Sequence, residues 1–519
     1  MTCDHSRAPV LEALLEFRRR GDVVYGPPGH KQGRGVDPEA LAILGESMFA
    51  ADVLMLNGLD DRLESRGVLQ AAEDLLADAV HADRTFFATC GSSMSVKTAM
   101  ISVAGPGEKL LLARNAHKSV MAGLIISGIE PVWIPARHDE HYQLTHPPGP
   151  AEIGPLLDAH PDAKGVLVVS PTDWGSCADL PAIARLCHEH GVPFIVDEAW
   201  GAHLPFHDRL PCWGMDAGAD VVVTSVHKMG AAIEQSSTYH LQGDLVDAEL
   251  LARRADIFGT TSSSALVYAS IDAWRRHMVR DGKRLWGEAL ARADRVRAAL
   301  VRLSGLELMD DRAIGPAAAA DLDPMRITID LGALGITGYT AADWLREQRH
   351  LDVGSSDSRH LGIQLGAADD DESEQSLITG LGQLQRAAGT LSPAPDLPLP
   401  GPELFTLEQA MTPQQAFFAP AEHIRTDEAL GRICAEMLSP YPPGVPVLAP
   451  GEVISAPTLD YLVAGAAAGM HIPDAADPTM RTIRVVVDNA CHDYGADSAR
   501  RRAARTAPPG HDSSAGDPG

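Results

Sequence analysis

The chain has 519 residues, enough to bury a large core in roughly two to four domains. Its 43 Lys and Arg against 70 Asp and Glu give a formal net charge of −27, which argues against non-specific binding to nucleic acid or to an anionic membrane surface. The seven cysteines are scattered without a Cys-x-x-Cys pair, so we expect reduced thiols and no metal site. The sequence shows neither a signal peptide nor a membrane-spanning stretch, and we therefore expect a cytoplasmic protein.

From about residue 67 to residue 241, short apolar runs alternate with longer helical patterns. The candidate strands cover residues 85–88, 109–113, 131–134, 165–170, 193–197 and 220–225. Runs such as GVLVVS, PFIVD and DVVVTS are apolar throughout and rich in β-branched residues, which is typical of strands buried on both faces of a parallel sheet. The alternation of strand and helix predicts an α/β domain with helices on both faces of a mostly parallel sheet.

The pattern changes after about residue 282. A charged amphipathic helix precedes the strand-like MRITIDL and HLGIQLG and the helical TAADWLREQRH and ESEQSLITGLGQLQRAA, which predicts a smaller α+β domain. Five prolines in residues 391–402 predict a linker. We therefore expect an N-terminal arm (1–40), a large domain (41–280), a small α+β domain (281–390), this linker, a C-terminal α/β unit (403–489) and a disordered tail (490–519).

Asp197 and Lys228 each stand at the carboxyl end of a predicted strand, where α/β sheets place functional groups. Partial burial would lower the pKa of Lys228 and make its amine nucleophilic, as a Schiff-base lysine requires. An acid at a neighbouring strand end could keep a pyridinium nitrogen protonated. Each string is common by itself, and a purely structural role is the alternative for both residues.

Two further groups follow strands in the same region. Gly91, Ser92 and Ser93 open a helix, and backbone amides at a helix N-terminus bind anions such as a cofactor phosphate, although an ordinary helix cap is the alternative. His117 starts the next helix and could stack on an aromatic cofactor ring or serve only as a hydrogen-bonded structural residue. The succession of phosphate site, ring-stacking histidine, ring acid and Schiff-base lysine is more specific than any one of its members.

In this arrangement the chain resembles the prokaryotic ornithine/lysine/arginine decarboxylases, which are fold type I pyridoxal-phosphate enzymes. The resemblance is carried by PPGHKQGRG (27–35), NGLDDRLESRGVLQAAE (57–73), CGSS (90–93), RNAHKS (114–119), SPTDWGSCADL (170–180), VDEAWGAH (196–203), TSVHKMGAAIEQSS (224–237), FGTTSSSALVYASIDA (258–273), TGYTAADWLRE (337–347) and PYPPGVPVLAPGE (440–452). It therefore spans almost the whole chain, and it is closest to the shorter members that lack an N-terminal receiver-like domain.

The resemblance implies a role for each matching residue. Lys228 would hold pyridoxal 5'-phosphate, Asp197 would pair with its pyridine nitrogen, and His117 would stack on its ring. The phosphate would be bound by Ser92, Ser93 and Ser225 with help from His227, and Trp200 would lie beside the ring. Residues 260–262 would reach the site of a neighbouring subunit, so a homodimer would be the smallest active unit. The expected reaction is α-decarboxylation of lysine, arginine or ornithine to the amine and CO₂, with Lys228 or His227 protonating Cα.

Several residues depart from the family pattern and leave the substrate open. Glu234 stands where the signature usually has a small residue, Asp173 and Trp174 stand where shorter members often have two tyrosines, and Ser263 replaces a frequent proline. The candidate acids for a cationic substrate tail are Asp60, Asp61, Glu234 and Asp357. One alternative is an aminotransferase or oxidative deaminase on the same scaffold, in which Arg359 would clamp a carboxylate. Another is a homologue without catalysis.

Overall fold

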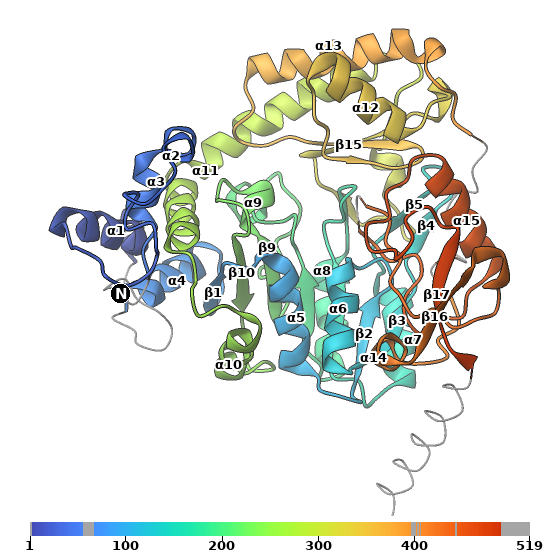
Figure 1. Cartoon of the computed structure of the whole chain (residues 1–519), viewed down its shortest axis with the longest axis horizontal. Coiled ribbons are helices and arrows are strands. Elements are labelled where there is room, and N and C mark those ends of the chain that lie inside the picture. The colour runs from blue at the N-terminus through green and yellow to red at the C-terminus, as the bar shows by residue number, and fades with distance from the viewer. Residues whose placement is uncertain are drawn as a thin grey trace, which may run out of the picture.

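The computed structural model describes residues 3–54, 67–395, 401, 404, 406–441 and 444–488. Its centre is a seven-stranded sheet in the order β1-β10-β9-β8-β6-β2-β3 (Figure 1). These strands are β1 (Arg84–Ala88), β2 (Lys109–Ala113), β3 (Glu130–Ile134), β6 (Val166–Val169), β8 (Phe194–Asp197), β9 (Val221–Ser225) and β10 (Ser237–Leu241). All neighbouring strands from β3 to β9 are parallel, while β10 runs antiparallel to both β9 and β1. The predicted α/β class is confirmed.

Apolar side chains fill both faces of this sheet, which explains the continuous apolar runs. On one face Leu111, Val168 and Val196 belong to a core shared with α4 (Val68–Ala79), α7 (Pro150–Ala159) and α8 (Leu180–Glu189). On the other face Leu110, Leu167 and Ile195 belong to a core shared with α5 (Gly91–Val103), α6 (Lys118–Ser127) and α10 (Ala248–Phe258). Because neighbouring residues of a strand point to opposite faces, these strands need apolar residues at every position.

The six predicted strands are present, but β10 escaped the sequence analysis. Its sequence STYHL is mostly polar, yet all five residues are buried. The hydroxyls of Thr238 and Thr224 share a hydrogen bond at 2.6 Å, and His240 Nδ1 forms a hydrogen bond with the Thr85 hydroxyl at 2.9 Å. The polar groups of β10 are thus satisfied inside the sheet, so an apolar pattern was not required.

The small domain is joined to the large domain by α11 (Ala265–Leu300), which runs across the expected boundary at residues 280 and 281. Its antiparallel sheet has the order β11-β13-β15-β14, with β11 (Glu307–Leu308), β13 (Arg326–Asp330), β14 (Ser355–Ser356) and β15 (His360–Gln364). Helices α12 (Gly338–Arg349) and α13 (Asp371–Ala387) cover this sheet (Figure 1). At the β14 edge of this sheet, the Ser355 hydroxyl donates to Asp173 of the large domain at 2.7 Å, so the small domain contacts the large domain there.

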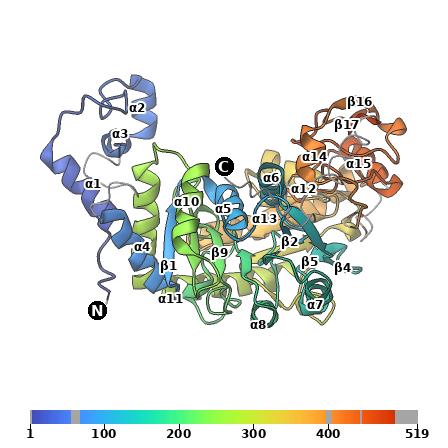
Figure 2. The same cartoon turned by 90° about the horizontal axis from the view of Figure 1, so that it is seen from below.

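The C-terminal unit has its own hydrophobic core, formed in part by Leu438, Leu462 and Val485. It contains α14 (Pro413–Phe418), α15 (Ala456–Ala467) and the antiparallel pair β16 (Ala421–Arg425) and β17 (Thr482–Val486). Figure 2 shows this unit at one end of the large domain, with the helices α1 (Pro9–Arg20), α2 (Pro38–Leu44) and α3 (Glu46–Ala51) at the other.

Short elements complete the chain: β4 (Arg137–Asp139), β5 (Leu144–His146), β7 (Ser176–Cys177), α9 (Val226–Met229) and β12 (Asp321–Leu322). Within the described residues, no helix is both long enough and apolar enough to cross a membrane. The expected tail at 490–519, part of the expected linker, and Asp60 and Asp61 lie outside the described residues.

Candidate active site

A cavity of about 520 Å³ lies at the carboxyl ends of the parallel strands and receives residues from the large domain, the small domain and the C-terminal unit. Most of the residues singled out in the sequence line it together: Gly91, Ser92, Ser93, His117, Asp173, Asp197, Trp200, Ser225, His227, Lys228, Glu234 and Asp357. Groups widely separated in the sequence therefore share one site, as expected for the carboxyl edge of an α/β sheet.

Lys228 lies in the short helix α9, directly after β9, so the strand end fixes where its side chain starts. Its Nζ lies 4.4 Å from the centre of the Trp200 ring. Burial lowers the pKa of Lys228, although Asp197 and Asp173 partly oppose this effect. A larger fraction of neutral amine is present than on a solvated lysine, which suits a nucleophile.

Asp197 ends β8 and is 3% exposed. Burial raises its pKa to about 6, while Lys228 and the Ala199 backbone N–H, which donates to Oδ1 at 3.2 Å, favour the charged form. A second cationic group in the cavity would complete the neutralisation of this carboxylate. A protonated nitrogen in the ring of a bound cofactor would have the required charge and hydrogen-bond donor.

The first turn of α5 and the end of β9 form a polar pocket beside Lys228. Gly91 takes φ +71°, a left-handed conformation that suits glycine where the strand turns into the helix. The Ser225 hydroxyl donates to the Ser92 hydroxyl at 2.6 Å. His227 Nδ1 donates to the Ser236 carbonyl at 2.9 Å, which leaves Nε2 without the ring's proton when the histidine is neutral. Hydroxyls and backbone amides at a helix N-terminus are groups that can bind an anion such as a phosphate.

His117 caps α6 with its side chain, since Nδ1 accepts the Ser119 backbone N–H at 3.2 Å. Burial, followed by the charge of Lys228, lowers the pKa of His117 to about 4, so the ring is neutral near pH 7. The C-terminal unit covers this ring: a Cβ atom added to Gly444 would lie 3.3 Å from the His117 ring, and the Lys118 backbone N–H donates to the Gly444 carbonyl at 2.9 Å. The C-terminal unit is therefore part of the active-site wall.

Asp173 lines the cavity but already has partners. Its Oδ2 accepts the Ser355 hydroxyl at 2.7 Å, and its Oδ1 lies 3.6 Å from Arg326 Nη2. The Arg326 guanidinium also lies 4.2 Å from the centre of the Trp200 ring. Sequence analysis missed Arg326 because it lies in the strand MRITIDL, where its neighbours indicated only a buried strand. Asp173 is thus neutralised by an arginine and is a poor candidate for a substrate cation.

Arg359, Glu234 and residues 260–262 were also singled out in the sequence. Arg359 lies outside the cavity lining, where its Nε donates to Asp330 at 2.6 Å, so the expected carboxylate clamp is not formed in this structure. Glu234 lies at the cavity rim with its side chain 84% exposed, 3.6 Å from His227 Nε2. Residues 260–262 are exposed and do not line the cavity of their own chain.

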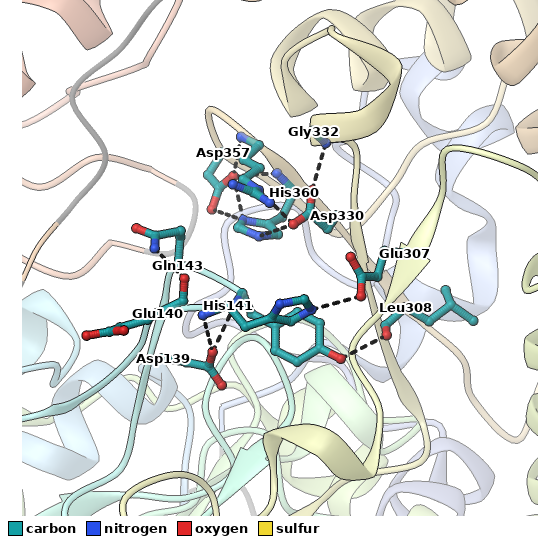
Figure 3. A network of polar contacts seen from close by, with 12 residues as sticks. Asp139, Glu140, His141, Gln143, Glu307, Leu308, Asp330, Gly332, Asp357 and His360 are labelled. Carbon is teal, nitrogen blue, oxygen red and sulfur yellow. Dashed lines mark hydrogen bonds and ion pairs between the residues drawn. The ribbon is translucent and has the colours of Figure 1, made fainter.

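Asp357 is one of the four acids that the sequence offered for a substrate cation, and it lines the cavity together with Tyr339 and Tyr461. Figure 3 shows Asp357 beside His360 and Asp330 in a network of polar contacts. Tyr339 belongs to the family-like string TGYTAADWLRE and Tyr461 to α15 of the C-terminal unit. Because Tyr461 follows the expected linker, only the folded structure shows that it belongs to the site.

Comparison with known proteins gives the same family over nearly the whole chain. The family model described as Orn/Lys/Arg decarboxylase, major domain, matches residues 8–361, and the model for the C-terminal domain matches residues 403–477. An arginine decarboxylase of Halalkalibacterium halodurans is 36% identical over 93% of this chain and 98% of its own length. An arginine decarboxylase of Bacillus subtilis is 35% identical over 92% of this chain and 97% of its own length.

Solved structures show a similar fold. The Escherichia coli constitutive lysine decarboxylase has a TM-score of 0.76 at 23% identity, with 93% of this chain and 82% of that chain covered. The Francisella novicida lysine decarboxylase LdcF has a TM-score of 0.78 at 20% identity, with 92% and 81% covered. The resemblance and the decarboxylase function expected from the sequence are confirmed. The chain belongs to the Orn/Lys/Arg decarboxylase family.

Proposed function

We propose that this chain uses pyridoxal 5'-phosphate, held by Lys228, to decarboxylate a basic amino acid, with arginine as the first candidate. The observation that carries the proposal is the pairing of a half-buried lysine of lowered pKa with the buried carboxylate of Asp197 in one cavity. Structural ion pairs also perturb pKa values, but they do not need an adjoining anion pocket and a 520 Å³ cavity.

The residues present fit the cofactor at each of its polar ends. The hydroxyls of Ser92, Ser93 and Ser225 and the amides of α5 suit its phosphate, and Asp197 suits its ring nitrogen. When bound, the cofactor supplies an electron sink for the pair of electrons left when a bond to Cα breaks.

The side chains then divide the remaining tasks. Asp197 holds a proton on the ring nitrogen, because its buried carboxylate is stabilised by a neighbouring positive charge. The neutral His117 ring offers a flat face without a competing charge. Lys228 and His227 lie in the cavity as the candidates to hand a proton to Cα after CO₂ leaves. Residues of the C-terminal unit, including Tyr441 and Val447, line the cavity and limit the access of water.

Arginine is the first candidate because the relatives at 35–36% identity are named arginine decarboxylases, whereas a lysine decarboxylase of Escherichia coli is 25% identical. The aminotransferase alternative loses the residue on which it rested, since Arg359 is bound to Asp330. A homodimer in which residues 260–262 reach the neighbouring site, and a cytoplasmic location, stay predictions.

The test is product identification with purified protein loaded with pyridoxal phosphate. Arginine, lysine and ornithine are supplied separately, and mass spectrometry distinguishes agmatine, cadaverine and putrescine. We expect agmatine from the wild type and no amine from Lys228→Ala. Borohydride reduction before proteolysis should attach the cofactor to the peptide that contains Lys228. An equal rate of amine formation by Lys228→Ala, or the attachment of the cofactor to another lysine, would contradict the proposal.

A further inference from the structure

Besides the groups assigned to the cofactor, the cavity lining contains the acidic residue Asp357. Asp357 follows β14 in the small domain, and its side chain is 23% exposed. The other three acids in the cavity lining are weaker candidates for a substrate cation. Asp197 is assigned to the ring nitrogen of the cofactor, Asp173 pairs with Arg326, and Glu234 is 84% exposed at the rim. Asp357 also has a partner, His360, but a histidine lacks the permanent charge of Arg326, and the Asp357 side chain keeps 23% of its surface exposed against 13% for Asp173. Asp357 is thus the lining carboxylate best placed to meet a ligand.

The Asp357 carboxylate is held rigidly in its charged form. Oδ1 accepts the backbone N–H groups of Arg359 at 2.7 Å and His360 at 2.6 Å, and Oδ2 lies 2.9 Å from His360 Nδ1. Burial disfavours the charge, but His360 and the two N–H groups outweigh it and lower the pKa of Asp357. His360, whose contact with Asp357 is drawn in Figure 3, is 2% exposed and does not line the cavity, so it holds the carboxylate without occupying space for a ligand.

The small-domain sheet that carries Asp357 is tied to the catalytic strands at two points. The Ser355 hydroxyl donates to Asp173, and Gln364 Nε2 donates to the Lys228 carbonyl at 2.5 Å. In addition, the Trp174 ring packs edge-on against His360 with ring centres 5.6 Å apart. These contacts fix the position of Asp357 relative to Lys228, as a substrate that reacts at one end and is recognised at the other requires.

Two tyrosines accompany the carboxylate. Tyr339 of α12 and Tyr461 of α15 line the same cavity, and burial followed by the charge of Asp357 raises the pKa of Tyr461. Among the described residues, neither hydroxyl has a hydrogen-bond partner, so both oxygens can accept from a ligand. Aromatic rings beside a carboxylate favour a cation, and several acceptors in one place suit the planar array of donors on a guanidinium.

We propose that Asp357, with Tyr339 and Tyr461, binds the distal cationic group of the substrate and thereby selects basic amino acids. The inference rests on the proposed function, because it takes the reacting end of the same substrate to lie at Lys228. A guanidinium and an ammonium both carry the required positive charge, and a comparison of arginine with lysine and ornithine distinguishes the two groups. The C-terminal unit, which supplies Tyr461, would then take part directly in substrate selection.

The test compares Asp357→Asn with the matched control Asp343→Asn. The control removes one negative charge from α12, where Asp343 is 66% exposed and bound to Arg346. Decarboxylation of arginine, lysine and ornithine is measured together with that of citrulline, the neutral isostere of arginine. Asp357→Asn should lower kcat/KM for the preferred basic amino acid by roughly 100-fold, mainly through KM, because a half-buried charge partner is lost. The same variant should leave kcat/KM for citrulline within about 3-fold of the wild type, since citrulline has no cation to pair with Asp357. The cofactor absorbance should be unchanged.

A second variant and a second readout keep the result decisive. Tyr461→Phe removes only the hydroxyl and should raise KM about 5-fold, so it tests the subsite even where Asp357→Asn does not fold. Calorimetric titration with agmatine, which carries the cation but no carboxylate, measures binding to the subsite without turnover.

Equal arginine kinetics and agmatine affinity in Asp357→Asn and Asp343→Asn would overturn the inference while the proposed function stands. Absence of amine from the wild type, with agmatine binding weakened only by Asp357→Asn, would overturn the function while the subsite stands. Absence of both turnover and binding in the wild type would overturn both.

Discussion

A buried ion pair between Arg114 and Glu452 attaches the C-terminal unit to the large domain, and a single substitution removes its negative charge. Arg114 Nε and Nη2 donate to Glu452 at 3.2 and 3.0 Å, and the two side chains are 2% and 1% exposed. Arg114 Nη1 also donates to the Pro446 carbonyl at 2.6 Å. Glu452→Gln keeps the shape and one acceptor oxygen but leaves the Arg114 charge buried without its counter-charge.

Removing one partner of a buried pair costs about 3–5 kcal/mol, and the retained acceptor places Glu452→Gln near the lower figure. At 1.4 kcal/mol for each factor of ten, about 3 kcal/mol corresponds to on the order of 100-fold more frequent local opening. The assay is amide hydrogen exchange followed by mass spectrometry. The relevant amides are Gly451, which donates to the Cys434 carbonyl at 2.8 Å, and Cys434, which donates to the Glu452 carbonyl at 2.9 Å.

The control is Glu288→Gln, which breaks a pair on the surface of α11. Arg284 and Glu288 are 59% and 60% exposed, so this change should alter stability by less than about 0.5 kcal/mol. We expect exchange in residues 432–452 to accelerate in Glu452→Gln only, together with weaker cofactor binding, because the same unit covers His117. If the two variants exchange alike, the ion pair does not hold this unit in place and the reasoning fails.

Two further predictions concern the cofactor pocket. His117 has a pKa of about 4 in the folded chain and about 6.5 when unfolded, so the unfolded chain binds the extra proton between these values and stability falls as the pH drops through them. Urea unfolding of the cofactor-free protein should show a loss of about 3 kcal/mol from pH 7 to pH 4 that His117→Gln lacks; identical pH profiles would contradict the assignment. Ser92→Ala loses the 2.6 Å bond from Ser225 and a phosphate donor, and titration should show cofactor affinity reduced by about 10-fold, whereas unchanged affinity would place the phosphate elsewhere.

The central sheet was predictable because its parallel strands are buried on both faces and therefore consist of continuous apolar runs. The same logic placed Asp197 and Lys228, since parallel strands end at one edge. Strand β10 escaped because its polar side chains satisfy one another in pairs such as Thr238 with Thr224, a compensation that no local pattern reveals.

The remaining active-site residues depend on contacts between domains. Arg326 was hidden in a buried strand, and only the structure shows its contacts with Asp173 and Trp200. Tyr461 and Glu452 come from a unit that follows the expected linker. How that unit docks decides that Tyr461 lines the cavity and that Glu452 pairs with Arg114. The sequence named Asp357 as one of several acids that could bind a substrate cation. Preferring it to Asp173 required the structure, which shows that Arg326 already neutralises Asp173.

The central claim is that the cavity around Lys228 removes the α-carboxylate of a basic amino acid. It is tested most directly with arginine labelled with carbon-13 at the carboxyl carbon alone, supplied to the holoenzyme and to Lys228→Ala in parallel. We predict that the wild type releases labelled CO₂ in a one-to-one ratio with unlabelled agmatine and that Lys228→Ala releases neither. Label retained in a keto acid, or labelled CO₂ formed equally by Lys228→Ala, would contradict the account.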